Sequence, residues 1–523
     1  MKNATPTPQN ASMASITVEA LTALQAEIAA LKQRLAWFEK QLFGQKSEKR
    51  LIDNPQQINL LGEAPSPTPA EGEQTTITYQ RGKAPKQRPD DCVNDSGLRF
   101  SADVPVEVIA LSAPELDGSS ADQFEIIGIK STYRLAQRPA SYVILQYDRP
   151  VLKRKDAEQP LPCPAPANVL DKSLADVSFL VGLLVDKFLY HLPLYRQHQR
   201  LTQAGITLSR ATLTNLVKRA IDLLRPIVDA QLANVLLSQV LAMDETPIKA
   251  GQASPGKLKT GWFWPLYGDQ DEVVFTFASS RGRQHIESTL RHRFRGTLIS
   301  DGYAAYARYA QHNDGVTHAQ CWVHSRRQFI EAEAQEPAAV REALDAIAAL
   351  YHIEEHIRNQ RLAGEKKHQH RLAHSKPIVD AFFAWCDRQL QRTDLTPSNP
   401  LSKALGYVMR REHELRVFLE DPAVPLDTNH LERALRPIPM GRKNWMFCWT
   451  ELGAEHVGII QSLISTCKLH EVNPSVYLTD VLLRISQHPA SQVTELTPRL
   501  WKARFARKPL RSDLHRDVND AVE

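Results

Sequence analysis

One stretch near the middle of the chain, Val240-Leu-Ala-Met-Asp244-Glu-Thr-Pro247, decides the fold. Its short apolar run predicts a buried strand that ends in an acidic residue. A second run of this kind, Gly296-Thr-Leu-Ile-Ser300, leads into Asp301. A third carboxylate, Glu432, lies in Asn429-His-Leu-Glu432-Arg-Ala-Leu-Arg436, which predicts a helix that Pro437 ends.

The elements around the first two acids follow a defined order. We expect strands at 239–243, 261–267 and 272–277, a helix at 284–293, a strand at 297–300, a helix at 304–311 and a strand at 316–320. This is the order of the ribonuclease H fold, in which the first and fourth strands are neighbours. The sequence therefore predicts that Asp244 and Asp301 lie close together.

Three carboxylates in one place suit a divalent metal centre. Magnesium or manganese prefers oxygen ligands, and a pair of such ions supports phosphoryl transfer on DNA. We therefore expect Asp244, Asp301 and Glu432 to be both the catalytic and the metal-binding residues. Glu245 is expected to face away, because side chains alternate along an extended chain.

Length and composition predict several domains. The chain has 523 residues, 42% of them hydrophobic and 24% charged, and a net charge of +5, which permits a nucleic-acid partner. No signal peptide or membrane span is expected, so we predict a cytoplasmic location near the nucleoid. The cysteines are scattered without close pairs, as in a reducing compartment: Cys92, Cys163, Cys321, Cys386, Cys448 and Cys467.

The predicted class is multidomain α+β, with eight segments. Residues 16–50 show a heptad pattern typical of a coiled coil that joins copies of the chain, or of a helix packed on its own domain. The other segments are a linker (51–95), a small β module (96–168), a helical domain (169–237), the first part of the core (238–325), an all-helical insertion (326–422), the second part of the core (423–470), and a C-terminal helix with a basic tail (471–523).

Several basic stretches are candidates for DNA contact. In the helical domain, Ser209 is a plausible N-cap after a glycine turn, which resembles a helix-turn-helix with Arg210 and Thr212 facing DNA; many helix pairs without DNA look the same. Nearer the acids the candidates are Arg326, Arg327, Arg433, Arg436, Arg442, Lys443 and Trp445. Ordinary surface ion pairs are the alternative there. The basic run 81–88 is as consistent with a solvated linker, and a solvated terminus is expected for the tail 499–511.

Zinc is not expected. His318, Cys321 and His324 recur at steps of three, but a fourth ligand is not evident. Cys321 and Trp322 fit a core better.

The motifs together resemble the large transposase of the insertion-sequence-66 family. The matching stretches are Trp37-Phe-Glu-Lys-Gln-Leu-Phe-Gly-Gln-Lys-Ser-Glu-Lys49, Met243-Asp-Glu-Thr-Pro247, Ser300-Asp-Gly-Tyr303, Cys321-Trp-Val-His-Ser-Arg-Arg327, Asn429 to Pro437, Gly441-Arg-Lys-Asn-Trp445 and Ser462-Leu-Ile-Ser-Thr-Cys-Lys-Leu469. The resemblance implies a DDE transposase that binds terminal inverted repeats and target DNA, cuts and joins DNA with magnesium, and works with small companion proteins. Its acidic triad falls on Asp244, Asp301 and Glu432.

One departure from the family concerns a cysteine-rich zinc module, of which only Cys92 and Cys163 remain here. Two other functions stay open: a nuclease that does not transfer strands, and a catalytically silent DNA-binding protein. The presence of all three acids argues against the silent protein.

Overall fold

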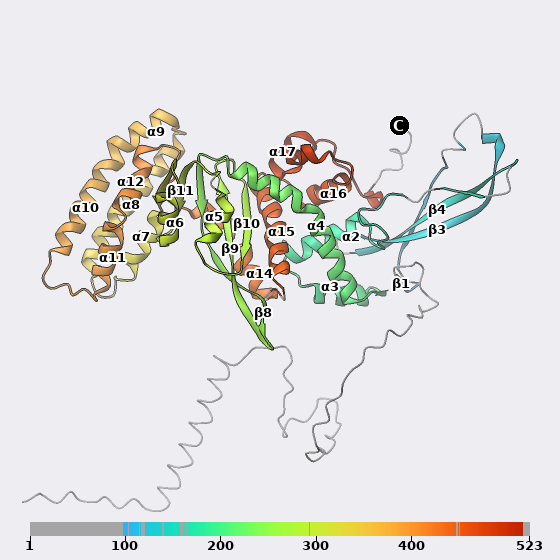
Figure 1. Ribbon diagram of the computed structural model, residues 1–523, viewed down its shortest axis with the longest axis horizontal. Coiled ribbons are helices and arrows are strands. Elements are labelled where there is room, and N and C mark those ends of the chain that lie inside the picture. The colour runs from blue at the N-terminus through green and yellow to red at the C-terminus, as the bar shows by residue number, and fades with distance from the viewer. Residues whose placement is uncertain are drawn as a thin grey trace, which may run out of the picture. The chain divides into compact units, whose positions relative to one another are not determined.

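The computed structural model describes residues 98–515 except 103, 114–115, 117–120, 139–140, 157–159, 164–165, 292, 446–447 and 449. The predicted coiled coil, the linker and Cys92 lie outside these residues. The described part is a mixed α+β protein (Figure 1). None of its helices is long and apolar enough to cross a membrane.

A six-stranded sheet forms the centre of the described chain. Its strands are β7 (Val240–Met243), β8 (Thr246–Ser254), β9 (Lys257–Gly268), β10 (Val273–Ala278), β11 (Gly296–Ser300) and β12 (Val316–Gln320). The order is β10-β9-β7-β11-β12, and β8 also pairs with β9. β11 runs parallel to both β7 and β12. The prediction that the two strands preceding Asp244 and Asp301 are neighbours is therefore confirmed.

Strand β8 was not predicted. It follows β7 in the chain and pairs with the same strand, β9. Met243 lies opposite Leu266 and Thr246 opposite Phe263, so the register is continuous and places Asp244 opposite Pro265. Proline has no N–H to donate, which interrupts the ladder at this point. The Asp244 N–H still donates to the Pro265 carbonyl at 3.4 Å. Asp244 and Glu245 thus occupy a break within one long strand.

Two long helices pack against the β10 side of the sheet, α4 (Arg210–Val235) and α15 (Glu451–Leu469). The Phe275 N–H donates to Ser462 Oγ of α15 at 2.9 Å, and Gln231 of α4 donates to the Val273 carbonyl at 2.8 Å. Gly458 allows the close approach, because a Cβ there would lie 2.4 Å from the Phe275 carbonyl oxygen. These contacts hold α4 and α15 against β10.

Shorter helices connect the strands and the acidic segments. They are α5 (Gln284–Leu290), α6 (Ala304–Gln311), α7 (Trp322–Ile330), α13 (Asn429–Leu435) and α14 (Pro437–Trp445). The predicted end of α13 before Pro437 is confirmed, and this proline begins α14, where its missing N–H costs nothing.

The segment predicted to be a helical insertion consists of helices and lies at the β12 edge of the sheet (Figure 1). It comprises α8 (Pro337–Asn359), α9 (Gly364–His370), a π-helical turn η3 (Arg371–Ser375), α10 (Lys376–Leu390), α11 (Pro400–Met409) and α12 (Glu412–Glu420). Helices α11 and α12 do not form one continuous helix, because the chain breaks at Arg411. Its φ of −125° departs from the helix, and its guanidinium donates to the Gly302 carbonyl at 2.9 Å.

The small β module consists of two long strands and two short ones. It contains β2 (Val106–Ala110), β3 (Phe124–Arg138), β4 (Ser141–Arg154) and β5 (Pro160–Pro162), in the order β2-β4-β3 with β5 against β4. β3 and β4 are 15 and 14 residues long, and β2 is parallel to β4. A crossover between β2 and β3, rather than a hairpin, explains the parallel pair.

The helical domain matches its prediction locally. It contains α2 (Val177–Phe188), α3 (Leu194–Gln203) and the start of α4, with Gly205 at φ +78° in the turn between α3 and α4. Ser209 Oγ accepts the Thr212 N–H at 3.0 Å, which confirms the N-cap. A short strand in the turn, β6 (Ile206–Thr207), pairs with β1 (Arg99–Phe100).

The C-terminal segment forms α16 (Pro474–Arg484), a 3₁₀ turn η4 (Ala490–Leu496) and α17 (Pro498–Arg504). Within the stretch 499–511, most basic side chains are exposed, as a solvated terminus would have them, but Trp501 is packed. Trp501 is 2% exposed, and its Nε1 donates to Asp480 at 2.8 Å. The Leu510 N–H donates to the same carboxylate at 2.7 Å. Burial of the indole and satisfaction of the Asp480 charge hold the tail in place.

A buried arginine joins the insertion to the segment that leads to α13. Arg371 is 0% exposed and binds both carboxylate oxygens of Glu354, at 2.7 and 2.8 Å. It also donates to the Phe418 carbonyl at 2.7 Å and to the Val424 carbonyl at 2.9 Å. One side chain thus ties η3 to α8, to the end of α12 and to the loop after it.

We expect Arg371→Ala to lower the free energy of unfolding by about 3–5 kcal/mol, because it leaves Glu354 and two carbonyls without their partner. Urea denaturation followed by tryptophan fluorescence measures the loss. Arg358→Ala, at an exposed position on α8, is the control. A loss no larger than that of the control would contradict a structural role for Arg371.

Candidate metal centre

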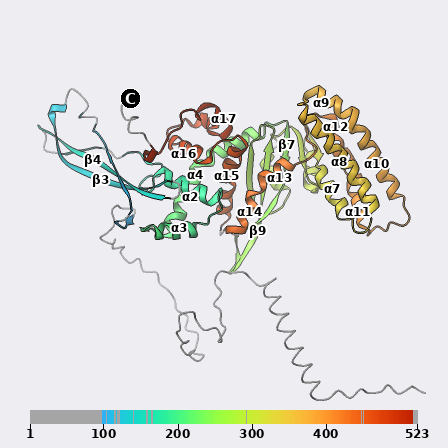
Figure 2. The same cartoon turned by 180° about the vertical axis from the view of Figure 1, so that it is seen from behind.

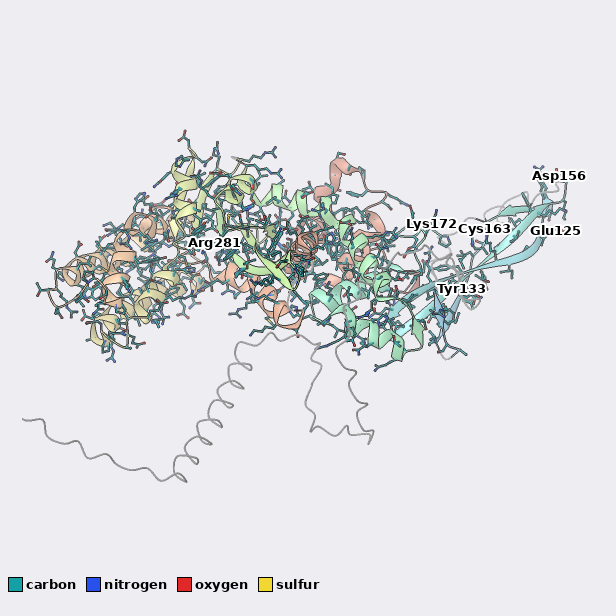
Figure 3. All side chains as sticks on the ribbon, turned by 60° about the horizontal axis from the view of Figure 1, so that its bottom comes forward. Glu125, Tyr133, Asp156, Cys163, Lys172 and Arg281 are labelled. Carbon is teal, nitrogen blue, oxygen red and sulfur yellow. The ribbon has the colours of Figure 1, made fainter. Side chains whose placement is uncertain are left out.

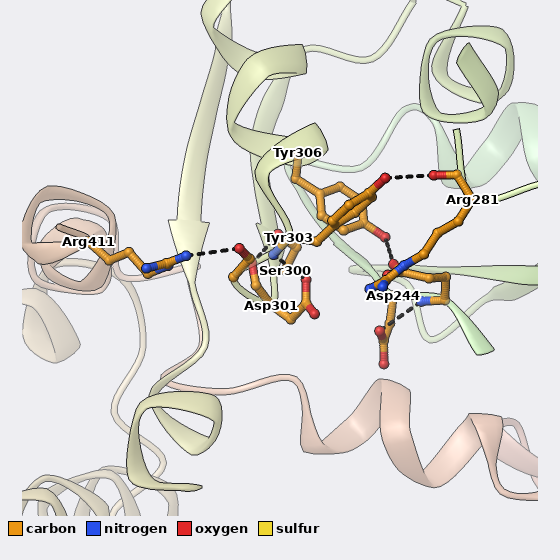
Figure 4. A network of polar contacts seen from close by, with 9 residues as sticks. Asp244, Arg281, Ser300, Asp301, Tyr303, Tyr306 and Arg411 are labelled. Carbon is orange, nitrogen blue, oxygen red and sulfur yellow. Dashed lines mark hydrogen bonds and ion pairs between the residues drawn. The ribbon is translucent and has the colours of Figure 1, made fainter. Parts of the chain in front are cut away.

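Two of the predicted acids meet where neighbouring parallel strands end. Asp244 follows β7 and Asp301 follows β11, and the carboxyl ends of parallel strands share one edge. Asp244, Glu245 and Asp301 each place one carboxylate oxygen within 4.8 Å of the others. Figure 4 shows Asp244 and Asp301 side by side at this edge. Within the described residues, this is the one group of three side chains with the spacing of a metal site.

Asp244 and Asp301 each keep one oxygen available. Asp244 Oδ1 accepts the N–H of Glu245 at 2.7 Å, and Asp301 Oδ1 accepts the N–H of Tyr303 at 2.9 Å. The second oxygen of each accepts no hydrogen bond from the described part of the chain. Local backbone contacts thus orient both carboxylates and leave one oxygen of each for a cation.

The prediction that Glu245 faces away is wrong. Although the strand register is continuous across residues 244 and 245, the Glu245 carboxylate lies beside the two aspartates. Its Oε1 accepts from Nε of Arg281 at 2.7 Å and from Nη2 at shorter range, and Oε2 accepts from the Tyr306 hydroxyl at 2.6 Å. Burial raises the pKa of Glu245, while the hydrogen bond from Tyr306 lowers it.

Glu432 lies near this group but outside the 4.8 Å cluster. It sits on α13 (Figure 2), which contacts β9. The rings of Tyr267 on β9 and His430 on α13 meet edge to face, 4.7 Å apart. Glu432 Oε1 is 3.9 Å from Nε2 of His324 on α7. Burial lowers the pKa of His324, while the negative charges of Asp301 and Glu432 raise it.

The charges of these acids act on one another. Burial raises the pKa of Asp244 to about 7, and the charges of Glu245, Asp301 and Glu432 add to the rise, although the Glu245 N–H opposes it. A cation would relieve this repulsion. The donor atoms are all carboxylate oxygens, which suits magnesium or manganese. The residues present therefore fit a divalent ion.

The residues of the weak zinc motif have other partners. Cys321 Sγ accepts from the N–H and the hydroxyl of Thr428, both at 3.3 Å, directly before α13. His318 Nε2 is 2.9 Å from Ser300 Oγ, and burial with the nearby Arg411 lowers the pKa of His318 to about 4. Cys163, the other cysteine of the degenerate module, is buried in the β module (Figure 3).

The predicted DNA-contacting residues fall into two groups. One group lies on the elements around Glu432: Arg326 and Arg327 of α7, Arg433 of α13, Arg436 just after it, and Arg442, Lys443 and Trp445 of α14. Most of these are exposed, but Arg442 is half-buried and donates to the Pro247 carbonyl of β8. The other group, Arg210 and Thr212, begins α4 in the helical domain, where Arg210 lies 5.8 Å from the ring of Tyr195.

Comparison with known proteins gives the family. The family model described as "Transposase IS66 family" matches residues 172–456, more than half of the chain. The chain belongs to this transposase family. The model of the IS66 C-terminal element matches residues 462–499, and that of "Transposase C of IS166 homeodomain" matches residues 30–109. The resemblance found in the sequence motifs is confirmed.

Two relatives of this IS66 transposase come from Sinorhizobium fredii (strain NBRC 101917 / NGR234). "Uncharacterized protein y4hP" is 29% identical over 510 residues, covering 91% of this chain and 89% of that protein. "Uncharacterized protein y4jD" is 32% identical over 358 residues, covering 65% of this chain and 69% of that protein. The similarity to y4hP therefore extends over nearly the whole transposase.

Sequence reasoning missed three side chains at the centre: Glu245, Arg281 and Tyr306. Arg281 follows the predicted third strand and Tyr306 lies in a predicted helix, and neither belongs to a motif with a chemical signature. The position of Glu245 next to Asp244 in the sequence could have indicated its place in the centre. Regular alternation along a strand instead predicted that its side chain faces away.

We expect Asp244→Asn to stabilise the protein at pH 8 without divalent ions. The folded pKa is raised from 3.8 to about 7, so ionisation costs nothing near pH 4 and its full penalty is reached above pH 7. The gain in free energy of unfolding is about 2 kcal/mol at pH 8, after a discount for partial exposure, and close to zero at pH 4. Denaturant unfolding in EDTA at both pH values measures it.

The matched control is Asp314→Asn, at an exposed carboxylate in the turn after α6. The same change in stability at pH 4 and pH 8 for Asp244→Asn would contradict the electrostatic origin of the gain.

Proposed function

We propose that this IS66 transposase is a DDE enzyme with a ribonuclease H-like core that cuts and joins DNA at the ends of a mobile element. One observation carries the proposal: β7 and β11 pair in parallel, so that the acids following them come together. The strand order β10-β9-β7-β11-β12, in which β9 runs opposite to the other four strands, supports the assignment of the core.

The proposed metal-binding residues are Asp244, Asp301 and Glu432. Each aspartate contributes the oxygen that its backbone contact leaves available, and Glu432 approaches from α13. Bound magnesium or manganese, as a pair of ions, would activate water or a 3′ hydroxyl and stabilise the departing 3′ oxygen. The protein's own part is to fix these carboxylates and to hold the DNA phosphate against them.

DNA is the partner that the transposase family and its homeodomain-like region imply. We propose that the basic side chains of α7, α13 and α14 contact the DNA backbone near the acids, and that Arg210 and Thr212 contact a more distant stretch. Residues 16–50 are proposed to join copies of the chain, and small proteins of the same element are proposed as helpers.

We expect purified protein with magnesium to join an element-end DNA to a target plasmid, and Asp301→Asn to lower joined product by at least about 10³-fold, because it removes one metal ligand. Gel analysis of end-labelled DNA measures both cleavage and joining. Asp314→Asn is the control and is expected to match the wild type.

The products also separate the alternatives. Cleavage without joining would favour a nuclease, and DNA binding without cleavage would favour a silent binding protein. Equal activity of Asp301→Asn and wild type would overturn the assignment of the acids.

A further inference from the structure

The loop between β10 and α5 carries an arginine that no motif pointed to. Arg281 has a side chain that is 43% exposed, directly beside the acidic centre (Figure 4). The Tyr303 hydroxyl donates a hydrogen bond to the Arg281 carbonyl at 2.6 Å and so holds the Arg281 backbone next to the acidic centre. Tyr303 is also the residue whose N–H orients Asp301. The position of Arg281 is therefore coupled to that of Asp301.

The guanidinium group is fixed in orientation. Its Nε and Nη2 both donate to Oε1 of Glu245. Its central carbon lies 4.4 Å from the centre of the Tyr303 ring and 5.1 Å from that of Trp262. Stacking on these two rings fixes the planar guanidinium group. A lysine ammonium group is not planar and could not stack in the same way. Arginine has five N–H donors, and Nη1 has no acceptor within the described residues. Donors thus remain on a half-exposed, immobilised cation.

Glu245 differs from its two acidic neighbours in how its oxygens are used. Both of its oxygens accept hydrogen bonds from side chains, Oε1 from Arg281 and Oε2 from Tyr306. Its side chain is 1% exposed. Asp244 and Asp301 each commit only one oxygen, and to backbone N–H groups. The hydrogen bonds therefore assign Glu245 to Arg281, although its distance alone would allow a role as a metal ligand.

We propose that Arg281 forms a phosphate subsite for the DNA strand at the acidic centre, and that Glu245 is the positioning residue that holds it there. The inference rests on the proposed function and deepens it. A phosphodiester approaching several carboxylates is repelled by them, and a cation beside the centre offsets this repulsion. The guanidinium fork matches two oxygens of one phosphate, so its remaining donors fit this ligand.

The aromatic rings add to this subsite in a specific way. Trp262 lies on β9 and Tyr303 follows β11, so the two rings bring two strands of the sheet to the same guanidinium. Arg281 is consequently fixed with respect to β11, which precedes Asp301, and to β9, which pairs with the strand before Asp244. A phosphate bound by Arg281 is thereby placed relative to Asp244 and Asp301 without a contact to either.

The test compares DNA binding of Arg281→Ala, Arg281→Lys and a control. The probe is a 30-base-pair duplex, with calcium in place of magnesium, and dissociation constants are measured by fluorescence anisotropy from 50 to 300 mM KCl. The control is Arg283→Ala, which removes an equally exposed arginine whose partner is Glu287, at 2.9 Å. Full-length protein is used throughout.

We expect Arg281→Ala to weaken binding about tenfold at 100 mM KCl. The slope of log affinity against log salt should fall by about 0.9, the loss of one phosphate contact. Arg281→Lys keeps the charge and should keep the slope while binding more weakly than wild type. The control should match wild type in both. If Arg281 had only a structural role, the alanine and lysine variants would show the same salt slope. An unchanged slope in Arg281→Ala overturns the proposal.

Manganese binding, measured by electron paramagnetic resonance, tests the role of Glu245. Glu245→Gln should bind manganese within about twofold of wild type and keep the salt slope, since Arg281 keeps its charge. It should bind the duplex more weakly, as Arg281→Lys does, because a neutral amide no longer holds the guanidinium in place. Loss of manganese binding together with wild-type duplex affinity would make Glu245 a metal ligand and overturn its positioning role.

A separate variant keeps the two proposals distinct. Asp301→Asn should lose manganese binding, and if it does not, the proposed metal centre fails whatever Arg281 does. If Asp301→Asn loses manganese while the slope of Arg281→Ala is normal, the metal centre stands and the phosphate subsite fails. Thermal unfolding of each variant identifies any that is misfolded, and the lysine variant then decides the outcome for Arg281.

Discussion

Parallel pairing of β7 with β11 is the constraint on which the rest of the centre depends. It brings the residues after two distant strands to one edge of the sheet, and both are aspartates. Pro265 lies opposite Asp244 and has no N–H to offer it, at the point where β7 ends and before β8 begins. Here Glu245 joins the two aspartates, and three carboxylates lie within 4.8 Å of one another.

Such convergence is electrostatically costly, and the surrounding structure offsets only part of the cost. Backbone N–H groups satisfy one oxygen each of Asp244 and Asp301, and Arg281 with Tyr306 satisfies Glu245. The remaining repulsion appears in the pKa of Asp244, raised to about 7 by burial first and by its acidic neighbours second. A bound cation would offset this repulsion, in line with the proposed metal centre.

The helical insertion contributes by fixing the segment that carries Glu432. Arg371 binds the carbonyls of Phe418 and Val424, and Cys321 holds Thr428 at the start of α13. Outside the insertion, Trp322 adds a hydrogen bond from its backbone N–H to the Leu426 carbonyl at 3.1 Å. The insertion thus braces the segment that leads to α13, and it also reaches the acidic centre, because the Arg411 guanidinium donates to the Gly302 carbonyl next to Asp301 at 2.9 Å.

The sequence by itself determined the strand order, the place of the two aspartates after neighbouring strands, the Ser209 cap and the family, because these follow from local hydrophobic patterns and motifs. Only the tertiary structure decided the inward turn of Glu245, the partnership of Arg281 with Tyr303 and Trp262, and the packing of Trp501 in the tail. Each of these depends on residues distant in sequence, such as Pro265 opposite Asp244 or Asp480 beneath Trp501. Local sequence patterns do not indicate such partners, because these contacts form only when the sheet and its helices assemble.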